Sequence, residues 1–195
     1  MTVAVIDYNA GNTRSVYYAL QRLGVDAVFT NDMNKIRSAD KVIFPGVGEA
    51  NSTMRYLKKM GLDQLIPSLT QPVLGVCLGM QLMCRWSEEN DTTCLGIFDV
   101  DVKRFPSTGQ EKVPHMGWNR IYQLDDKMFD ADLEGEYAYF VHSYYVPVNP
   151  GTTALCNYIH PFSAGISRDN FYATQFHPEK SGPVGARIIQ HFLDL

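Results

Sequence analysis

The chain has 195 residues, of which 45% are hydrophobic and 19% are charged, and its formal net charge is −4 at pH 7. This composition excludes a disordered polypeptide, and the small negative charge offers no basic footprint for a nucleic acid. The first residues lack a basic n-region, and no window approaches about eighteen apolar residues, so we expect neither a signal peptide nor a membrane span. We expect one domain over residues 1–195, located in the cytoplasm.

Short apolar segments alternate with amphipathic segments in the first half of the chain. Strand-like runs lie at residues 2–8, 26–30, 41–46 and 72–77. Helical spacing of apolar residues lies at 13–24, 50–66 and 78–87. This alternation predicts an α/β fold with a mostly parallel central sheet that is flanked by helices.

The second half of the chain is richer in strands. Strand-like runs lie at residues 96–105, 119–124, 138–146, 152–159, 162–169 and 171–177, and a helix is predicted at 182–195. The stretch 112–119 reads as a loop. We expect the strands to form an antiparallel or mixed extension of the same sheet, because few helices separate them.

Cys77 stands where a predicted strand meets a predicted helix, within the pattern Gly75-Val76-Cys77-Leu78-Gly79. This is the cysteine counterpart of a nucleophile elbow, in which side chains two positions away on either side would collide. The helix N-terminus favours a thiolate, and the next backbone N–H, that of Leu78, points toward an oxyanion. The alternative is a buried cysteine in a strand-to-helix turn.

The other cysteines, Cys84, Cys94 and Cys156, lack this frame, and the chain has no C-x-x-C pair. We expect free thiols in a reducing compartment rather than a disulfide framework. Cys84 is expected on the same helix as the elbow, packed in the core.

A proton partner for the cysteine is predicted at His177, the last residue of the strand-like run 171–177. Glu179 follows two positions on, and strand alternation would place it on the same side. The carboxylate can then orient the imidazole toward the sulfur. The alternative is a strand end with a solvated glutamate, but together with the elbow the pattern predicts a Cys-His-Glu triad.

A glycine-rich turn, "PGVG" at residues 45–48, follows another predicted strand. Such a turn leaves backbone N–H groups uncovered, as an oxyanion hole requires. It lacks both the G-x-G-x-x-G pattern and the lysine of a phosphate loop, so phosphate binding is disfavoured.

In combination, "PGVG", "GVCLGMQ" and "QFHPEKS" resemble the class I glutamine amidotransferases. More narrowly, "DYNAGNTRSV", "VPHMGWN" and "FVHSYYV" resemble the glutaminase subunits of imidazole glycerol phosphate synthase, in histidine biosynthesis. The match runs from end to end. One departure is Asn9, where this family often has glycine.

The resemblance implies that Cys77 attacks the side-chain amide of glutamine and that His177 and Glu179 complete the triad. The N–H groups of Val47 and Leu78 would hold the oxyanion. The residues implied in glutamine binding are Gly46, Gly48, Gln81, Glu89, Ser143 and Tyr144. No cofactor and no metal are implied.

The resemblance also implies a partner. Ammonia would pass to a (β/α)8-barrel cyclase subunit in a heterodimer, which makes imidazole glycerol phosphate and an aminoimidazole carboxamide ribonucleotide. The implied partner face carries Asn12, Trp118, Tyr139 and Lys180, although core packing is an alternative for the two aromatic residues. An amidotransferase with another acceptor, a hydrolase that acts alone and a non-enzymatic scaffold remain as alternative functions.

Overall fold

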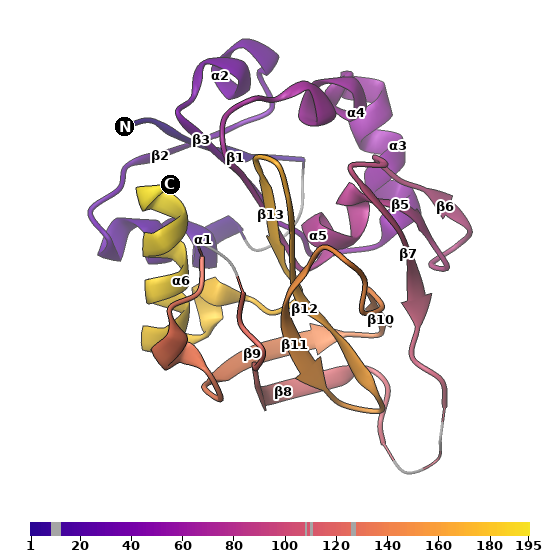
Figure 1. Ribbon diagram of the computed structural model, residues 1–195. Helices are drawn as coiled ribbons and strands as arrows, with labels where there is room; N and C mark the ends of the chain where they lie inside the picture. The colour runs from indigo at the N-terminus through magenta and orange to yellow at the C-terminus, as the bar shows by residue number, and fades with distance from the viewer. Residues whose placement is uncertain (9–12, 108, 110, 126–127) are drawn as a thin grey trace.

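The computed structural model describes residues 1–8, 13–107, 109, 111–125 and 128–195 (Figure 1). Its central sheet is formed by β1 (Val3–Ile6), β2 (Ala27–Thr30), β3 (Lys41–Phe44), β4 (Val73–Val76), β11 (Thr152–Asn157), β12 (Pro161–Arg168) and β13 (Phe171–Thr174). The order is β11-β12-β13-β4-β3-β1-β2. From β2 to β13 all neighbours are parallel, and β12 and β11 add antiparallel strands at one edge. The predicted fold class is confirmed.

Helices cover both faces of this sheet. They are α1 (Thr13–Arg22), α2 (Met33–Ser38), α3 (Ala50–Met60), α4 (Leu62–Leu65), α5 (Leu78–Met83) and α6 (Gly182–Asp194). Ala4 and Ile6 of β1 pack in one apolar cluster with α2 to α5, whereas Val3 and Val5 pack in a second cluster with α1 and α6. In Figure 1, α6 lies to the left of the sheet and α3 and α5 lie to its right. The central strands are continuous apolar runs because both of their faces are buried.

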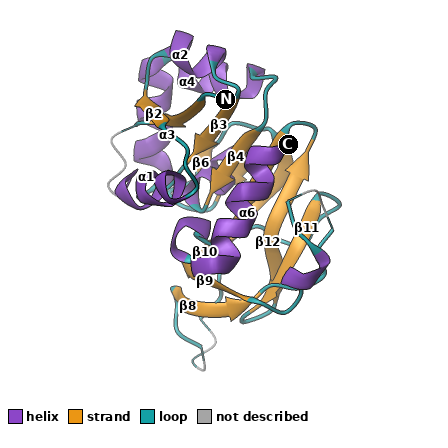
Figure 2. Cartoon of the chain, turned by 90° about the vertical axis from the view of Figure 1, so that its left-hand side faces the viewer, coloured by secondary structure: helices purple, strands orange, loops and turns teal. Residues whose placement is uncertain are grey.

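The strands between α5 and β11 do not extend the central sheet, so that part of the expectation is wrong. One additional sheet consists of β5 (Cys84–Ser87), β6 (Thr92–Thr93), β7 (Phe98–Arg104) and β10 (Tyr144–Tyr145), in the order β10-β7-β5-β6. The other is an antiparallel hairpin of β8 (His115–Arg120) and β9 (Tyr137–His142). Figure 2 shows β8 at the end of the molecule opposite α2.

The predicted strand 138–146 is divided between these two sheets. His142 pairs with His115 in the hairpin, whereas Tyr144 pairs with Arg104 in the four-stranded sheet. Apolar alternation predicts a strand but not the strand with which it pairs. The change of sheet at Ser143 could therefore not be predicted from the pattern.

Several boundaries also differ from the expectation. The predicted helix 50–66 is interrupted at Gly61, which has a φ of 70° and caps α3; α4 and a 3-10 turn (Ile66–Ser68) follow. The predicted helix 78–87 ends at Met83, so Cys84 begins a strand instead of lying on the helix, although it is buried as expected.

Three further differences concern the loops. The predicted loop at 112–119 contains most of β8, and the predicted strand at 119–124 retains only an isolated bridge at Tyr122 beyond Arg120. Helix α2 was not predicted; Asp32 caps it by accepting hydrogen bonds from two backbone N–H groups.

Within the described ranges, we find no helix that has both the length and the apolar character to cross a membrane.

Candidate active site

Three neighbouring parallel strands deliver the candidate site to one edge of the sheet. The "PGVG" loop follows β3, Cys77 follows β4, and His177 lies three residues beyond the end of β13. Because β3 and β13 both pair with β4, the carboxyl ends of all three strands meet. This edge is where α/β sheets ordinarily place their ligands.

Cys77 occupies a strained turn. Its φ is 52° and its ψ is −106°, a conformation that few residues other than glycine adopt, and it forms the N-cap of α5. A Cβ atom on Gly79 would overlap the carbonyl oxygen of Phe44, and one on Gly46 would overlap the backbone of Gly79. A Cβ on Gly75 would lie 2.9 Å from the sulfur of Met83. The glycines therefore let α5 pack directly against the "PGVG" loop.

The sulfur of Cys77 has two polar neighbours. Its thiol donates to the carbonyl oxygen of Val141 at 3.8 Å, and the side-chain amide of Gln175 donates to the sulfur at 3.7 Å. Gln175 was not singled out in the sequence. The available signal was a glutamine two positions before a candidate catalytic histidine, in an otherwise apolar run.

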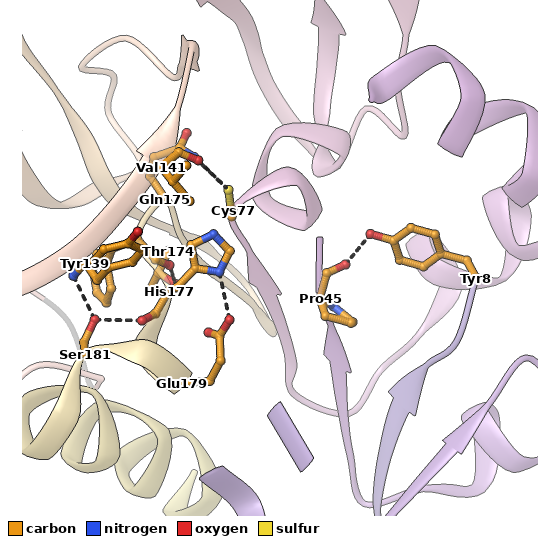
Figure 3. Close-up of polar contacts among 11 residues, drawn as sticks. Tyr8, Pro45, Cys77, Tyr139, Val141, Thr174, Gln175, His177, Glu179 and Ser181 are labelled. Carbon is orange, nitrogen blue, oxygen red and sulfur yellow. Dashed lines mark hydrogen bonds and ion pairs between the residues drawn. The ribbon is translucent and has the colours of Figure 1, made fainter. Parts of the chain in front are cut away.

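His177 and Glu179 form a buried pair, with side chains 1% and 5% exposed and Nδ1 2.8 Å from Oε1. A carboxylate only accepts, so Nδ1 carries the hydrogen and Nε2 is left as the acceptor. Among the described residues Nε2 has no hydrogen-bond partner, and Figure 3 shows it directed toward Cys77. The two side chains meet through a 3-10 turn (Pro178–Lys180), not through strand alternation, which corrects the reason for the predicted pair.

The charge state of His177 depends on these neighbours. Burial by itself lowers the pKa of His177, but the Cys77 sulfur and the Glu179 carboxylate outweigh burial and raise the pKa to about 10. A proton placed on this imidazole is therefore well stabilised, as expected of a group that accepts a proton from a thiol.

The backbone of His177 is held by the hairpin. Its N–H donates to the carbonyl oxygen of Tyr139 at 2.9 Å. The hydroxyl of Ser181 donates to the His177 carbonyl at 2.7 Å and accepts from the Tyr139 N–H at 3.0 Å (Figure 3). Strand β9 thus positions the imidazole.

A cavity of about 340 Å³ opens over the sulfur. It is lined by Cys77 and His177, by the two predicted oxyanion residues Val47 and Leu78, and by all six residues implied in glutamine binding: Gly46, Gly48, Gln81, Glu89, Ser143 and Tyr144. Pro114, Val141 and His142 complete the wall. Among the described residues, no cluster of three or more His, Cys, Asp or Glu side chains is arranged to hold a metal ion.

Two of these residues are anchored by their own hydrogen bonds. The Gln81 amide nitrogen donates to the Tyr144 carbonyl at 2.9 Å and to Gln175 Oε1 at 3.0 Å. The Glu89 carboxylate accepts from the Ala50 N–H at 2.8 Å, at the start of α3. Burial raises the pKa of Glu89, and the Ala50 N–H opposes this shift. Glu89 would pass for a solvated charge in the sequence, but it lies partly buried against the cavity.

The implied partner face lies beside this site. Trp118 is 55% exposed, which argues against core packing, and its ring lies 5.9 Å from that of Tyr139 in an edge-on contact. Lys180 lies in the turn that carries Glu179. Asn12 lies outside the described residues, as does Asn9.

A pair of buried histidines adjoins the cavity and predicts a pH-dependent stability. His115 Nδ1 lies 3.1 Å from His142 Nε2, and burial lowers the pKa of His115 from 6.5 to about 4 and that of His142 to about 3. Both rings are neutral in the folded chain but take up protons when it unfolds. The contribution of these two histidines to the free energy of unfolding is therefore fully present above pH 6.5. It is lost progressively as the pH drops toward 3.

Urea unfolding between pH 6.5 and about pH 5 measures this loss, with a limiting slope of about 1.4 kcal/mol per pH unit for each proton. His115→Phe replaces the imidazole by a ring that can still stack on Phe140 and Tyr158 but cannot take up a proton. The free energy of unfolding should therefore change less steeply with pH in this variant. His177 does not interfere in this window, because its raised pKa makes its contribution complete below pH 6.5; above pH 6.5 that contribution is lost as the pH rises and would oppose the slope. Equal slopes in the two proteins would contradict the prediction.

The strained cysteine, the His-Glu pair and the glycine loop are of the kinds that thiol-dependent amide hydrolysis uses. The family described as "Glutamine amidotransferase class-I" matches residues 4–195, so this chain belongs to the class-I glutamine amidotransferases. A solved structure titled "Crystal structure of glutamine amidotransferase" is 18% identical, with a TM-score of 0.77 over 98% of this chain and 97% of that one. PurLQS from Thermotoga maritima is 15% identical, with a TM-score of 0.71 over 99% and 97%. These two likenesses concern the fold.

The sequence relatives are more specific. The chain is 64% identical over 196 residues to the imidazole glycerol phosphate synthase subunit HisH of Bacteroides thetaiotaomicron, covering 100% of both chains. It is 46% identical over 197 residues to the subunit of the same name from Escherichia coli K12, again covering 100% of both. Within its class, the chain belongs to the family of imidazole glycerol phosphate synthase subunit HisH, and both levels of the resemblance are confirmed.

Proposed function

We propose that this chain hydrolyses glutamine to glutamate and ammonia as the glutaminase subunit of an imidazole glycerol phosphate synthase. The observation that carries the proposal is the cavity itself. This cavity of about 340 Å³ is lined by Cys77, by His177, whose Nε2 has no hydrogen-bond partner among the described residues, and by every residue implied in glutamine binding. The three side chains of the proposed triad are Cys77, His177 and Glu179.

In the proposed reaction, His177 Nε2 takes the thiol proton that is now donated to the Val141 carbonyl. The thiolate attacks the amide carbon of glutamine, and the oxyanion is held by the N–H groups of Leu78 and Val47. His177 then gives its proton to the departing nitrogen, and ammonia leaves. Water, activated by His177, hydrolyses the thioester and releases glutamate, while Glu179 stabilises the imidazolium.

The "PGVG" loop is held on both sides in this arrangement. Gly46 lies against the start of α5, and the Tyr8 hydroxyl donates to the Pro45 carbonyl at 2.6 Å (Figure 3). Gly48 has a φ of 126°, which favours glycine. These contacts support an oxyanion strand whose position is set by residues outside the triad.

We further propose that the ammonia passes to a (β/α)8-barrel cyclase subunit in a cytoplasmic heterodimer. Ammonia released into neutral water becomes mostly ammonium, which is not a nucleophile, so a shielded transfer to the acceptor is chemically sensible. The relatives' name describes a subunit of a synthase. The exposed Trp118 belongs to the hairpin that holds the His177 backbone, which favours docking at this face. The four free cysteines suit a reducing compartment.

A reconstituted complex tests the division of labour. With Cys77→Ala in this chain, the complex should make no product from glutamine but should regain product formation with an ammonium salt at alkaline pH, because the thiol takes no part in the cyclase chemistry. The wild-type complex with each nitrogen source is the control. If ammonia fails to restore product while the complex still assembles, ammonia supply is not the role of this chain. Equal glutaminase turnover of the free chain and the complex would favour a hydrolase that acts alone.

A further inference from the structure

Gln175 is a fully buried side chain that the reaction above does not use. It follows β13 directly, two positions before His177, and its residue is 0% exposed. Its Nε2 lies 3.7 Å from the Cys77 sulfur, and its Oε1 accepts from Gln81 Nε2 at 3.0 Å. Figure 3 places Gln175 beside Cys77 and Val141.

The orientation of the Gln175 amide follows from a chain of obligatory donors and acceptors. The backbone carbonyl of Tyr144 can only accept, and it receives hydrogen bonds from Gln81 Nε2 at 2.9 Å and from His142 Nδ1 at 2.7 Å. The NH₂ group of Gln81 must therefore face the Tyr144 carbonyl, and its second N–H donates to the side-chain oxygen of Gln175. A reversed Gln175 would bring two NH₂ groups face to face, so its NH₂ group points at the sulfur.

The sulfur consequently lies between an acceptor and a donor that have opposite effects on the stability of a thiolate. The Val141 carbonyl accepts from the neutral thiol and repels a thiolate, whereas the Gln175 N–H strengthens its interaction when the sulfur becomes negative. In a site this buried, an oriented donor counts for more than it would in water. The proton transfer to His177 leaves a negative sulfur that needs such a donor.

We propose that Gln175 is a catalytic residue that donates a hydrogen bond to the Cys77 thiolate, in an orientation imposed by Gln81 and the Tyr144 carbonyl. The inference rests on the proposed role of Cys77 as nucleophile. It connects Gln81 and Tyr144, two cavity residues that are implied in glutamine binding, to the reactivity of the Cys77 sulfur. Gln175 thus supplies an interaction that neither His177 nor the helix N-terminus provides.

Alkylation of Cys77 by iodoacetamide tests the proposal without glutamine. Both proteins carry Cys84→Ala, so that the adduct is read at Cys77 by peptide mass spectrometry. Gln175→Met keeps the length of the side chain but removes the donor, and the rate at neutral pH should fall about tenfold, as expected for one hydrogen bond to a charged group. At high pH, where the thiol is ionised in both proteins, the two rates should converge.

Gln190→Met, the same exchange on α6 where the amide contacts Asp194, is the matched control and should leave alkylation unchanged. Equal rates for Gln175→Met and wild type at neutral pH would overturn the proposal, and so would an equal slowing at every pH, which indicates blocked access. If Gln175→Met does not fold, Gln175→Glu retains the acceptor for Gln81 and should also slow the neutral reaction; an unchanged rate overturns the proposal. If the wild-type complex shows no glutaminase activity while Gln175→Met slows alkylation as expected, only the proposed function is contradicted.

Discussion

Cys77→Ala should abolish glutamine hydrolysis, whereas Cys84→Ala should leave most of it. The sulfur of Cys77 opens into the cavity opposite His177 Nε2. Cys84 is 0% exposed at the start of β5, and its thiol donates to the Met80 carbonyl at 3.5 Å. Burial raises the pKa of Cys84 well above its ordinary value, so this thiol forms no thiolate at neutral pH. Removal of a nucleophile typically costs a factor on the order of 10⁴ or more.

Steady-state release of glutamate from the complex measures this difference. Cys84→Ala also loses some packing, so its thermal unfolding should be followed and the assay kept well below its midpoint. Substantial activity in Cys77→Ala, or an equal loss in two folded variants, would show that Cys77 is not the nucleophile.

Gly79→Ala should cost several kcal/mol and leave little folded protein, since a typical domain is stable by only about 5–15 kcal/mol. The added Cβ would overlap the Phe44 carbonyl oxygen at the end of β3, which is backbone and cannot turn aside. Helix α5 would have to move away from the "PGVG" loop, which would displace Cys77 as well. The overlap arises where helix α5 meets the end of β3, and no flexible side chain can absorb it because the overlapped atom is backbone.

Gly24→Ala is the matched control. Gly24 has a φ of 74°, and a Cβ there would meet no heavy atom within 4 Å, so only the backbone conformation is strained. That strain costs about 1–2 kcal/mol. Urea unfolding followed by circular dichroism compares the two variants. If Gly79→Ala is as stable as Gly24→Ala, the close approach of α5 to β3 does not limit the fold.

Features that depend on residues close together in the chain could be predicted from the sequence. The alternation of apolar strands and helices predicted the parallel sheet, because a strand buried on both faces must be apolar throughout. The turn at Cys77 was predictable because its glycines lie two positions away on either side, although the backbone that a Cβ on Gly79 would overlap belongs to Phe44 on another strand. Strand alternation predicted the pairing of His177 with Glu179, and the pair forms, but a 3-10 turn brings the two side chains together.

Features that depend on partners far away in the chain became visible only in the folded protein. Residues 138–146 divide between two sheets because β9 pairs with β8 and β10 pairs with β7. Cys84 leaves the helix because β5 pairs with β6 and β7. The Gln175 amide is oriented by a carbonyl at Tyr144, through Gln81, across three segments of the chain. Periodicity and spacing report the faces of one element, whereas pairing and hydrogen-bond direction are set by groups that only folding brings within reach.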